Sequence, residues 1–327
     1  MDPLKWISRE YHEINGSTFD VLETVPSPLE FARIAQISRP VLIRGFQPPA
    51  AKVWTNSYLI ERLGSSAISV AVTPNGCADA VTRFDGKFYF AEPHVEQMTM
   101  ASFLSNLSPD KEVAKGRTET YYLQSQNGNL YSSRFFDGLD DPSEFKALRD
   151  DVPSEVFWCS EALGRPPDAV NLWMGDSGSV SSVHSDPYEN MYTVIRGAKH
   201  FTLLPPAEGW CLKERMYPHA MYTRSLGSQT LELRPSSSDI PKVRWSSITE
   251  PHLPGALAPD AHPIYITVKM GDTLYLPAGW WHHVRQSGIT IALNWWYDME
   301  MRGMNWVILS FLRTIQDVPD GNELDEV

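Results

Sequence analysis

The chain has 327 residues, of which 42% are hydrophobic and 11% aromatic, a composition typical of a globular protein with a packed core. Its formal net charge of −12 argues against non-specific nucleic-acid binding, which needs a basic surface. No stretch approaches the roughly 20 apolar residues that cross a bilayer, and the N-terminus lacks the apolar run of a signal peptide. We therefore expect no direct contact with nucleic acid or membrane.

Three cysteines, Cys77, Cys159 and Cys211, lie far apart in the sequence and show no zinc-binding or redox spacing. This pattern is typical of a reducing compartment, so we expect a cytoplasmic protein that also has access to the nucleus.

The segment 1–119 is expected to form helices and short strands that pack on a larger β-domain. A helix is predicted near 5–14. A second helix should start at Ser27-Pro28-Leu29-Glu30, because serine and glutamate form a capping box and proline suits the first helical position. Short apolar runs predict strands at 40–46, 69–73 and 120–125.

From about residue 170 short strands dominate the pattern. Segments 191–196 and 199–204 flank Gly197-Ala198, which predicts a hairpin. Further strands are expected at 265–269, 273–276, 282–286 and 289–296.

Short strands with tight turns favour a mainly β fold, a double-stranded β-helix of the jelly-roll or cupin-like kind, with flanking N-terminal and C-terminal helices. We place this core at 120–300, with an irregular insertion rich in Ser, Pro and Gly at about 225–262.

A helix is predicted at 301–316, followed by an acidic tail at 317–327 that we expect to be disordered. The apolar residues of the helix fall on one stripe: Met304, Val307, Ile308, Phe311, Leu312 and Ile315. This stripe either packs on the protein's own barrel or forms a homodimer interface, and the sequence leaves both alternatives open.

The segment His184-Ser185-Asp186 carries the clearest chemical signal. On a strand, residues two apart point to the same side, so an imidazole and a carboxylate would lie together. His282, in an apolar and aromatic run, would supply a third ligand from a neighbouring strand. Two histidines and one carboxylate are the set that holds non-haem Fe(II) and leaves about three of its six coordination positions open. An isolated His-X-Asp is weak evidence, because most such tripeptides are surface or hydrogen-bonded pairs.

Two further features fit an anionic cosubstrate. Lys199 lies on an otherwise apolar segment, where a buried ammonium needs an anion unless it lies at a turn in solvent. In the last strand, alternation places Thr290, Ala292, Asn294 and Trp296 on one face, which suits the lining of a cavity. Asn190 lies an even number of residues after His184 and Asp186, so its side chain would point to the same side as theirs if the strand continues through Pro187.

Taken together, the motifs resemble those of the JmjC-domain oxygenases, in their small hydroxylase branch. The resemblance covers nearly the whole chain and rests on Pro40-Val-Leu-Ile-Arg-Gly45, Tyr122-Leu-Gln124, His184-X-Asp186, Arg196-Gly-Ala-Lys199, Gly271-Asp-Thr-Leu-Tyr-Leu-Pro277 with His282, and Ala292-Leu-Asn-Trp-Trp-Tyr297.

The resemblance implies roles for individual residues. His184, Asp186 and His282 would bind Fe(II), with His282 preferred to His283 because the family ligand is the first histidine of the pair. The cosubstrates would be 2-oxoglutarate and O2. The residues expected to bind 2-oxoglutarate or support the metal are Lys199, Tyr122, Ser181, Asn190 and Asn294.

The activity implied by the resemblance is hydroxylation of a lysine in a protein, with developmentally regulated GTP-binding proteins as the expected partners. Gln124 and Asp79 are expected to contact this substrate. The motifs alone leave open demethylation of N-methyl-lysine and cleavage of histone tails at methylated residues. A non-catalytic cupin-type binding protein is also an alternative, although the intact ligand set and Lys199 argue against it.

Overall fold

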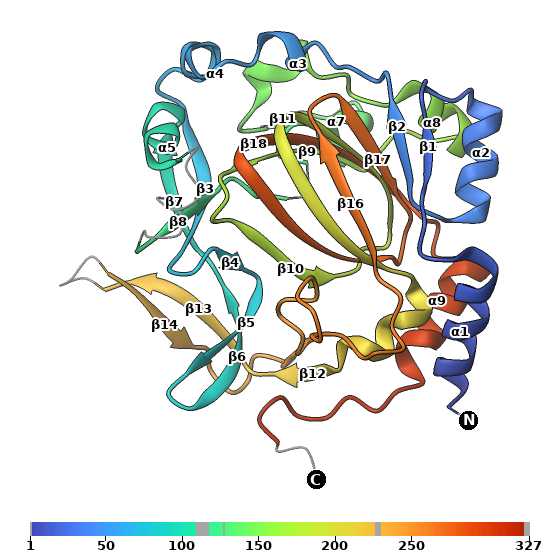
Figure 1. Ribbon diagram of the computed structural model, residues 1–327. Helices are drawn as coiled ribbons and strands as arrows, with labels where there is room; N and C mark the ends of the chain where they lie inside the picture. Colours follow the sequence, from blue (N-terminus) through green and yellow to red (C-terminus); the bar gives the residue numbers. More distant parts are fainter. Residues whose placement is uncertain (1, 109–117, 127, 226–229, 324–327) are drawn as a thin grey trace.

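The computed structural model describes residues 2–108, 118–126, 128–225 and 230–323, which form a β-barrel with helices around it (Figure 1). The main sheet has nine strands in the order β1-β2-β17-β11-β18-β10-β4, with β16 paired to β11 and β9 paired to β18. Its strands are β1 (Asp20–Leu22), β2 (Val41–Arg44), β4 (Cys77–Ala78), β9 (Ala169–Gly175), β10 (Val180–His184), β11 (Tyr188–Leu204), β16 (Ile264–Lys269), β17 (Asp272–Leu276) and β18 (Trp281–Asp298). The predicted mainly β, cupin-like fold is confirmed.

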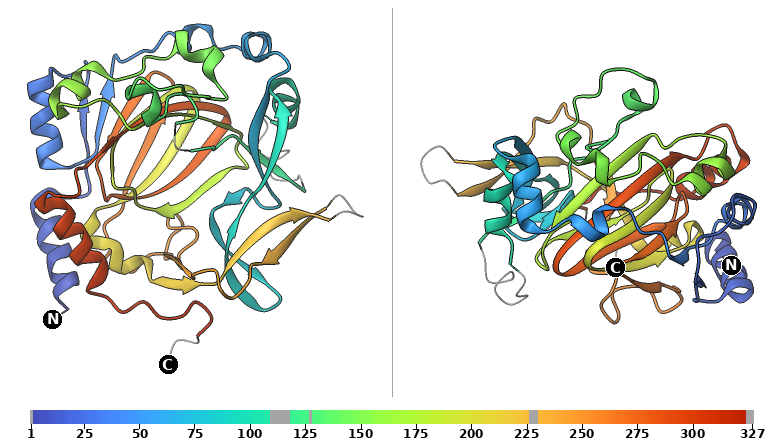
Figure 2. Two further views of the ribbon diagram at one scale, coloured as in Figure 1. Left: turned by 180° about the vertical axis from the view of Figure 1, so that it is seen from behind. Right: turned by 90° about the horizontal axis from the view of Figure 1, so that it is seen from above.

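Strands β11 and β18 form the centre of the barrel. They pair antiparallel along their full length, from Tyr188 opposite Asp298 to Leu204 opposite Trp281. The first half of β11 also pairs with β17, and its second half pairs with β16. Seen from above, these long strands bend around the interior (Figure 2). The barrel therefore has two half-sheets that share β11 and β18. Strand β9 joins the half near Asn294, and β10 joins the half near His282, which we call the smaller half-sheet.

The hairpin predicted at Gly197-Ala198 is wrong, because β11 continues through it with two register shifts. Gly197 has φ +74°, and a Cβ atom there would lie 2.5 Å from Thr290 Oγ1 on β18. A glycine with positive φ serves a β-bulge as well as a tight turn, so the sequence signal did not distinguish the two.

The alternation predicted in β18 is confirmed. Ile291, Leu293 and Trp295 point outward into a cluster that includes Phe31 of α2 (Pro28–Ile37) and Trp158 of α8 (Phe157–Leu163). Ala292 and Trp296 belong instead to the cluster inside the barrel. The predicted capping box at Ser27 and Glu30 starts α2.

Smaller elements surround the barrel, and the segment 1–119 adds β1, β2 and β4 to the main sheet itself. Three smaller sheets have the orders β7-β3-β8, β14-β13-β6-β5 and β12-β15. The segment 225–262, expected to be irregular, includes β14 and β15. The remaining strands are β3 (Ala67–Thr73), β5 (Ala80–Phe84), β6 (Lys87–Glu92), β7 (His94–Thr99), β8 (Thr120–Tyr122), β12 (Glu214–Tyr217), β13 (His219–Arg224), β14 (Leu231–Pro235) and β15 (Val243–Ser246). The other helices before the C-terminal one are α1 (Pro3–Asn15), α3 (Ala50–Val53), α4 (Asn56–Leu63), α5 (Met100–Asn106), α7 (Ser133–Phe136) and the 3-10 helices η1 (Lys146–Asp151) and η2 (Pro206–Leu212).

The C-terminal helix α9 (Met304–Thr314) lies beside α1 and η2 (Figure 1). Five of the six residues of its predicted apolar stripe are exposed, with Met304 69% and Phe311 53% exposed, so packing of the stripe on the protein's own barrel is contradicted. The sixth, Leu312, is half-buried. Within the described parts of the chain, no helix combines the length and the apolar character that a membrane span requires.

The tail expected to be disordered is ordered in part. Gly321 N donates to Met216 O at 2.9 Å, and Asn322 exchanges two hydrogen bonds with the backbone of Phe88. These backbone contacts hold the start of the acidic segment against β12 and β6, and residues 324–327 lie outside the described residues.

Candidate metal centre

The three predicted ligands meet at one end of the smaller half-sheet. His184 ends β10 and lies opposite His282 of β18 in the antiparallel register. Asp186 follows in the turn between β10 and β11, where its carbonyl oxygen accepts a hydrogen bond from Gly279 N at 2.8 Å. The strand therefore does not run unbroken through Pro187. Asn190 nevertheless lines the cavity that contains His184, Asp186 and His282, because β11 turns back toward these ligands.

The geometry of the two imidazoles suits metal coordination. The ligand atoms of His184, Asp186 and His282 all lie within 4.8 Å of one another. Asp186 Oδ2 is 3.8 Å from Nε2 of His184 and 3.7 Å from Nε2 of His282. The Nδ1 atoms face backbone carbonyl oxygens, Ser182 O at 2.7 Å and Trp280 O at 3.0 Å. Since Nδ1 must donate there, Nε2 carries the lone pair that a metal would bind.

Burial keeps His282 neutral. It lowers the pKa of His282 to about 4, with a further contribution from neighbouring His184. A neutral imidazole can coordinate a metal without first losing a proton. The adjacent His283 points away from the barrel interior, where its ring stacks on His252 with centroids 5.3 Å apart. The structure thus brings His282, and not His283, to the predicted centre.

Lys199 is buried inside the barrel with 2% of its surface exposed, which rules out the alternative of a solvated turn. Its Nζ donates to Tyr122 OH at 3.0 Å, and Ser181 in turn hydrogen-bonds Tyr122. Burial lowers the pKa of Lys199 to about 7. Among the described residues no carboxylate forms an ion pair with this ammonium, so the interior offers a cation that an anionic ligand would satisfy.

Asn294 and Asn190 belong to a buried amide network beside the metal-binding residues. Asn294 Nδ2 donates to Asn190 Oδ1 at 3.1 Å, while Asn294 Oδ1 accepts from Asn171 at 3.2 Å and from Trp173 Nε1 at 2.9 Å. Asn171 and Trp173 on β9 were missed from the sequence. Their alternation in a buried strand was the available signal, since Asn171 lies opposite Asn294 in the register.

A separate cavity of about 240 Å³ adjoins the predicted ligands His184 and Asp186 and holds both residues expected to contact substrate. Gln124 Nε2 donates to Asp79 Oδ2 at 3.0 Å. Burial raises the pKa of Asp79, against the opposing effect of Gln124. Among the residues that the structure describes, Asp79 has no ion-pair partner.

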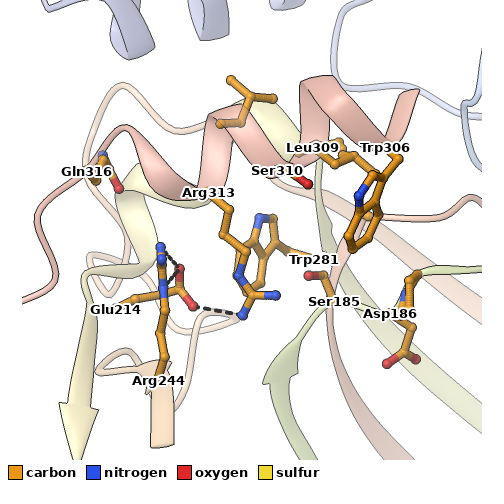
Figure 3. Close-up of a pocket in the computed structure, with 15 residues that line it drawn as sticks. Ser185, Asp186, Glu214, Arg244, Trp281, Trp306, Leu309, Ser310, Arg313 and Gln316 are labelled. Atoms are coloured by element: carbon orange, nitrogen blue, oxygen red, sulfur yellow. Dashed lines mark hydrogen bonds and ion pairs between the residues drawn. The ribbon is translucent and has the colours of Figure 1, made fainter. Parts of the chain in front are cut away.

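Helix α9 supports the other side of the centre. A cavity of about 160 Å³ lies under the helix, and the Asp186 carboxylate points away from it (Figure 3). Glu214 accepts from both Arg244 and Arg313, and the Arg313 guanidinium lies over the ring of Trp281, which precedes His282. Since these charges are paired with one another, this region holds the chain near His282 and Asp186 in place and offers no free charge to a ligand.

Two imidazole nitrogens and one carboxylate on the same side are the donor set of a non-haem iron site, and the unpaired ammonium of Lys199 fits an acidic cosubstrate. The residues present therefore fit an Fe(II)/2-oxoglutarate centre.

Comparison with known proteins agrees with this chemistry. A family model described as a cupin-like domain matches residues 26–303. The chain is 35% identical to lysine-specific demethylase JMJ32 of Arabidopsis thaliana, over 94% of this chain and 89% of that protein. It is 37% identical to the human bifunctional peptidase and (3S)-lysyl hydroxylase JMJD7, over 85% of this chain and 84% of that protein. It is also 32% identical to JmjC domain-containing protein E of Dictyostelium discoideum, over 88% and 86% respectively.

Proposed function

The chain belongs to the JmjC oxygenases, within the cupin-like fold, and from this premise we propose that it is an Fe(II)- and 2-oxoglutarate-dependent hydroxylase of lysine in a protein. The observation that carries the lysine assignment is the Asp79 carboxylate, which lies without an ion-pair partner among the described residues in the cavity beside His184.

In this proposal His184, Asp186 and His282 hold Fe(II), and Lys199 pairs with the distal carboxylate of 2-oxoglutarate. When bound, this pair supplies activation of O2, with one oxygen atom going to a substrate carbon and the other to succinate as CO2 leaves. Tyr122 and Ser181 orient the Lys199 ammonium, and Asn294 with Asn190 lines the end near the metal. Burial of these groups excludes water, which strengthens each charge interaction.

Asp79 is the residue that would bind the ammonium of the substrate lysine. A half-buried carboxylate without a cation is costly, and the ammonium of a substrate lysine would compensate it. An unmethylated ammonium has three N–H donors, which match the Asp79 oxygens and the amide oxygen of Gln124. With the ammonium held there, the methylene carbons of the lysine are the part free to approach the metal. These features favour hydroxylation of a carbon over removal of an N-methyl group.

The substrate protein is proposed from resemblance. The human relative is named a (3S)-lysyl hydroxylase as well as a peptidase. We propose a developmentally regulated GTP-binding protein as the substrate of this chain, encountered in the cytoplasm or nucleus. The net charge of −12 would favour the approach of a basic segment of such a partner.

Mass spectrometry of the GTP-binding protein after incubation with enzyme, Fe(II), 2-oxoglutarate and O2 tests the proposal. The expected product is heavier by one oxygen atom on a lysine. Loss of a methyl group from a methylated lysine would identify a demethylase, and a shortened chain would identify a protease. In either case lysyl hydroxylation would be rejected.

Variants at Asp79 test the role of the carboxylate. Asp79→Asn should raise KM for the lysyl substrate about tenfold or more, because the charge partner of the ammonium is lost. Asp85→Asn is a matched control, since Asp85 also has a positive φ but lies in an exposed turn away from the cavity. An unchanged KM in Asp79→Asn would remove Asp79 from substrate binding.

A further inference from the structure

A further cavity, of about 530 Å³, lies on the outer face of the smaller half-sheet. His283 and Arg285 of β18 point into it because they alternate with His282 and Val284, which face the barrel interior. The other walls come from β4, β10, β15 and the segment that follows β15, including Trp245 of β15 and His252 of that segment. A volume between about 300 and 1,000 Å³ is typical of cavities that bind small organic molecules.

The cavity contains polar groups that the protein leaves unsatisfied. His283 is only 1% exposed, yet neither of its ring nitrogens has a hydrogen-bond partner among the described residues. The same holds for Nδ1 of His252 and for Nε of Arg285. Buried polar atoms are nearly always paired, an arginine can only donate hydrogen bonds, and each imidazole has at least one N–H. Arg285 Nε and these ring N–H groups therefore call for acceptors on a ligand, while Gln286 Oε1 in the same lining is an acceptor without a partner among the described residues.

The charges around the cavity favour an anion. Arg285 forms no ion pair with a described residue, and Glu250, the acidic residue of the lining, is exposed at the rim. Trp245 and Ile248 add apolar walls. A metal ion fits poorly, since the described part of the chain places no third histidine, cysteine or carboxylate close enough to His252 and His283 to complete a ligand set.

The cavity adjoins the one that contains Asp79, because Ser182 and Trp245 line both. Strands β4 and β10 divide the two, with Ala78 and Ser181 on one side and Cys77 and Val180 on the other. The two shared residues are joined by a hydrogen bond, in which Trp245 Nε1 donates to Ser182 Oγ at 3.1 Å. Its volume of about 530 Å³ matches a small organic molecule, which is the occupant that we consider.

We propose that this cavity binds a small organic oxyanion, a carboxylate or a phosphate ester with an apolar group, through Arg285, His283 and His252. The occupant would also contact Trp245, whose ring stacks on His184 at 6.1 Å between centroids. It would also contact His283, which follows the proposed ligand His282 in the sequence. The occupant would therefore lie against residues that neighbour two of the three proposed metal ligands, His184 and His282.

Calorimetric titration of the metal-free full chain tests the site, with benzoate, phenyl phosphate, inorganic phosphate and neutral benzamide as probes. Benzoate or phenyl phosphate should bind at least about tenfold more tightly than benzamide and inorganic phosphate, because charge and apolar contact both contribute. Binding of only one of the two identifies the anion class. Equal binding of benzamide, binding of inorganic phosphate as tight as that of phenyl phosphate, or no binding of any probe overturns the proposal.

Variants assign the binding to this cavity. Arg285→Met should weaken binding about tenfold or more, whereas Lys269→Met, an exposed lysine on the same face of the sheet but outside the cavity, should not. His252→Phe keeps the ring that stacks on His283 but removes its nitrogens, and should weaken binding even if Arg285→Met fails to fold. Lys199→Met should bind the probe as wild type does. Loss of binding in Lys199→Met, or unchanged binding in His252→Phe and in a folded Arg285→Met, would place the anion elsewhere.

Discussion

Replacing Lys199 with methionine should stabilise the metal-free protein near neutral pH. Burial lowers the pKa of Lys199 from 10.5 to about 7, so the folded protein holds this ammonium at a cost while the unfolded chain does not. A difference of about 3.5 pKa units corresponds to roughly 5 kcal/mol, of which roughly 4 kcal/mol applies at pH 7. Loss of the hydrogen bond to Tyr122 lowers the stability of the variant by about 1 kcal/mol. The expected net gain in unfolding free energy is about 3 kcal/mol.

The sign of the pH dependence distinguishes this explanation from simple repacking. Between about pH 7 and pH 10.5 the unfolded wild type binds more protons than the folded wild type, so wild-type stability rises with pH across this window. The methionine variant has no such proton, and its advantage should disappear by about pH 10.5.

Urea denaturation at a series of pH values, with a chelator present, measures both effects. The matched control is Lys269→Met, an exposed lysine whose replacement should leave stability within about 0.5 kcal/mol. Added 2-oxoglutarate should stabilise wild type and not Lys199→Met. A variant less stable than wild type at pH 7, or an advantage that is constant with pH, would refute the explanation.

Three further outcomes are expected. Gly197→Ala should lower the unfolding free energy by about 3 kcal/mol in urea denaturation, because its φ is +74° and the new Cβ meets Thr290; a neutral effect would show that the bulge is not constrained. Lysyl-substrate KM should rise on acidification at a pH above that of an ordinary aspartate, because burial raises the pKa of Asp79 and the carboxylate is lost as pH falls; an Asp79→Asn enzyme should not show this rise. Sedimentation should find a homodimer for wild type and for Asn305→Asp, and a folded monomer for Phe311→Glu, since Phe311 lies on the exposed apolar stripe of α9; a monomeric wild type would contradict this interface.

The sequence predicted the parts of the site that follow from strand alternation. In β18 the period of two places Asn294 and Trp295 on opposite faces, as the structure has them. The choice of His282 over His283 rests on the family resemblance, because alternation says only that the two point to opposite sides. The sequence does not determine the burial of Lys199, because the apolar character of the segment does not say whether a lysine two residues after Gly197 lies in the interior or at a turn.

Other features depend on long-range contacts that no local pattern reports. Gly197 suits a turn or a bulge equally, and only the pairing of β11 with β18 decides between them. Asn171 is an ordinary buried amide until the register places it opposite Asn294. The acidic tail is held by the backbone of Gly321 and the side-chain amide of Asn322, which hydrogen-bond to the backbone of β12 and β6, and its composition does not indicate this.

The central claim is that His184, Asp186, His282 and Lys199 form one Fe(II)/2-oxoglutarate centre. Anaerobic titration of the protein with Fe(II) and 2-oxoglutarate tests it most directly, through the visible charge-transfer absorption of the iron–2-oxoglutarate chelate. We expect this absorption in wild type and in His283→Ala, and its loss in His184→Ala and His282→Ala. An undiminished absorption in His184→Ala, or its loss in a folded His283→Ala with retention in His282→Ala, would contradict the account.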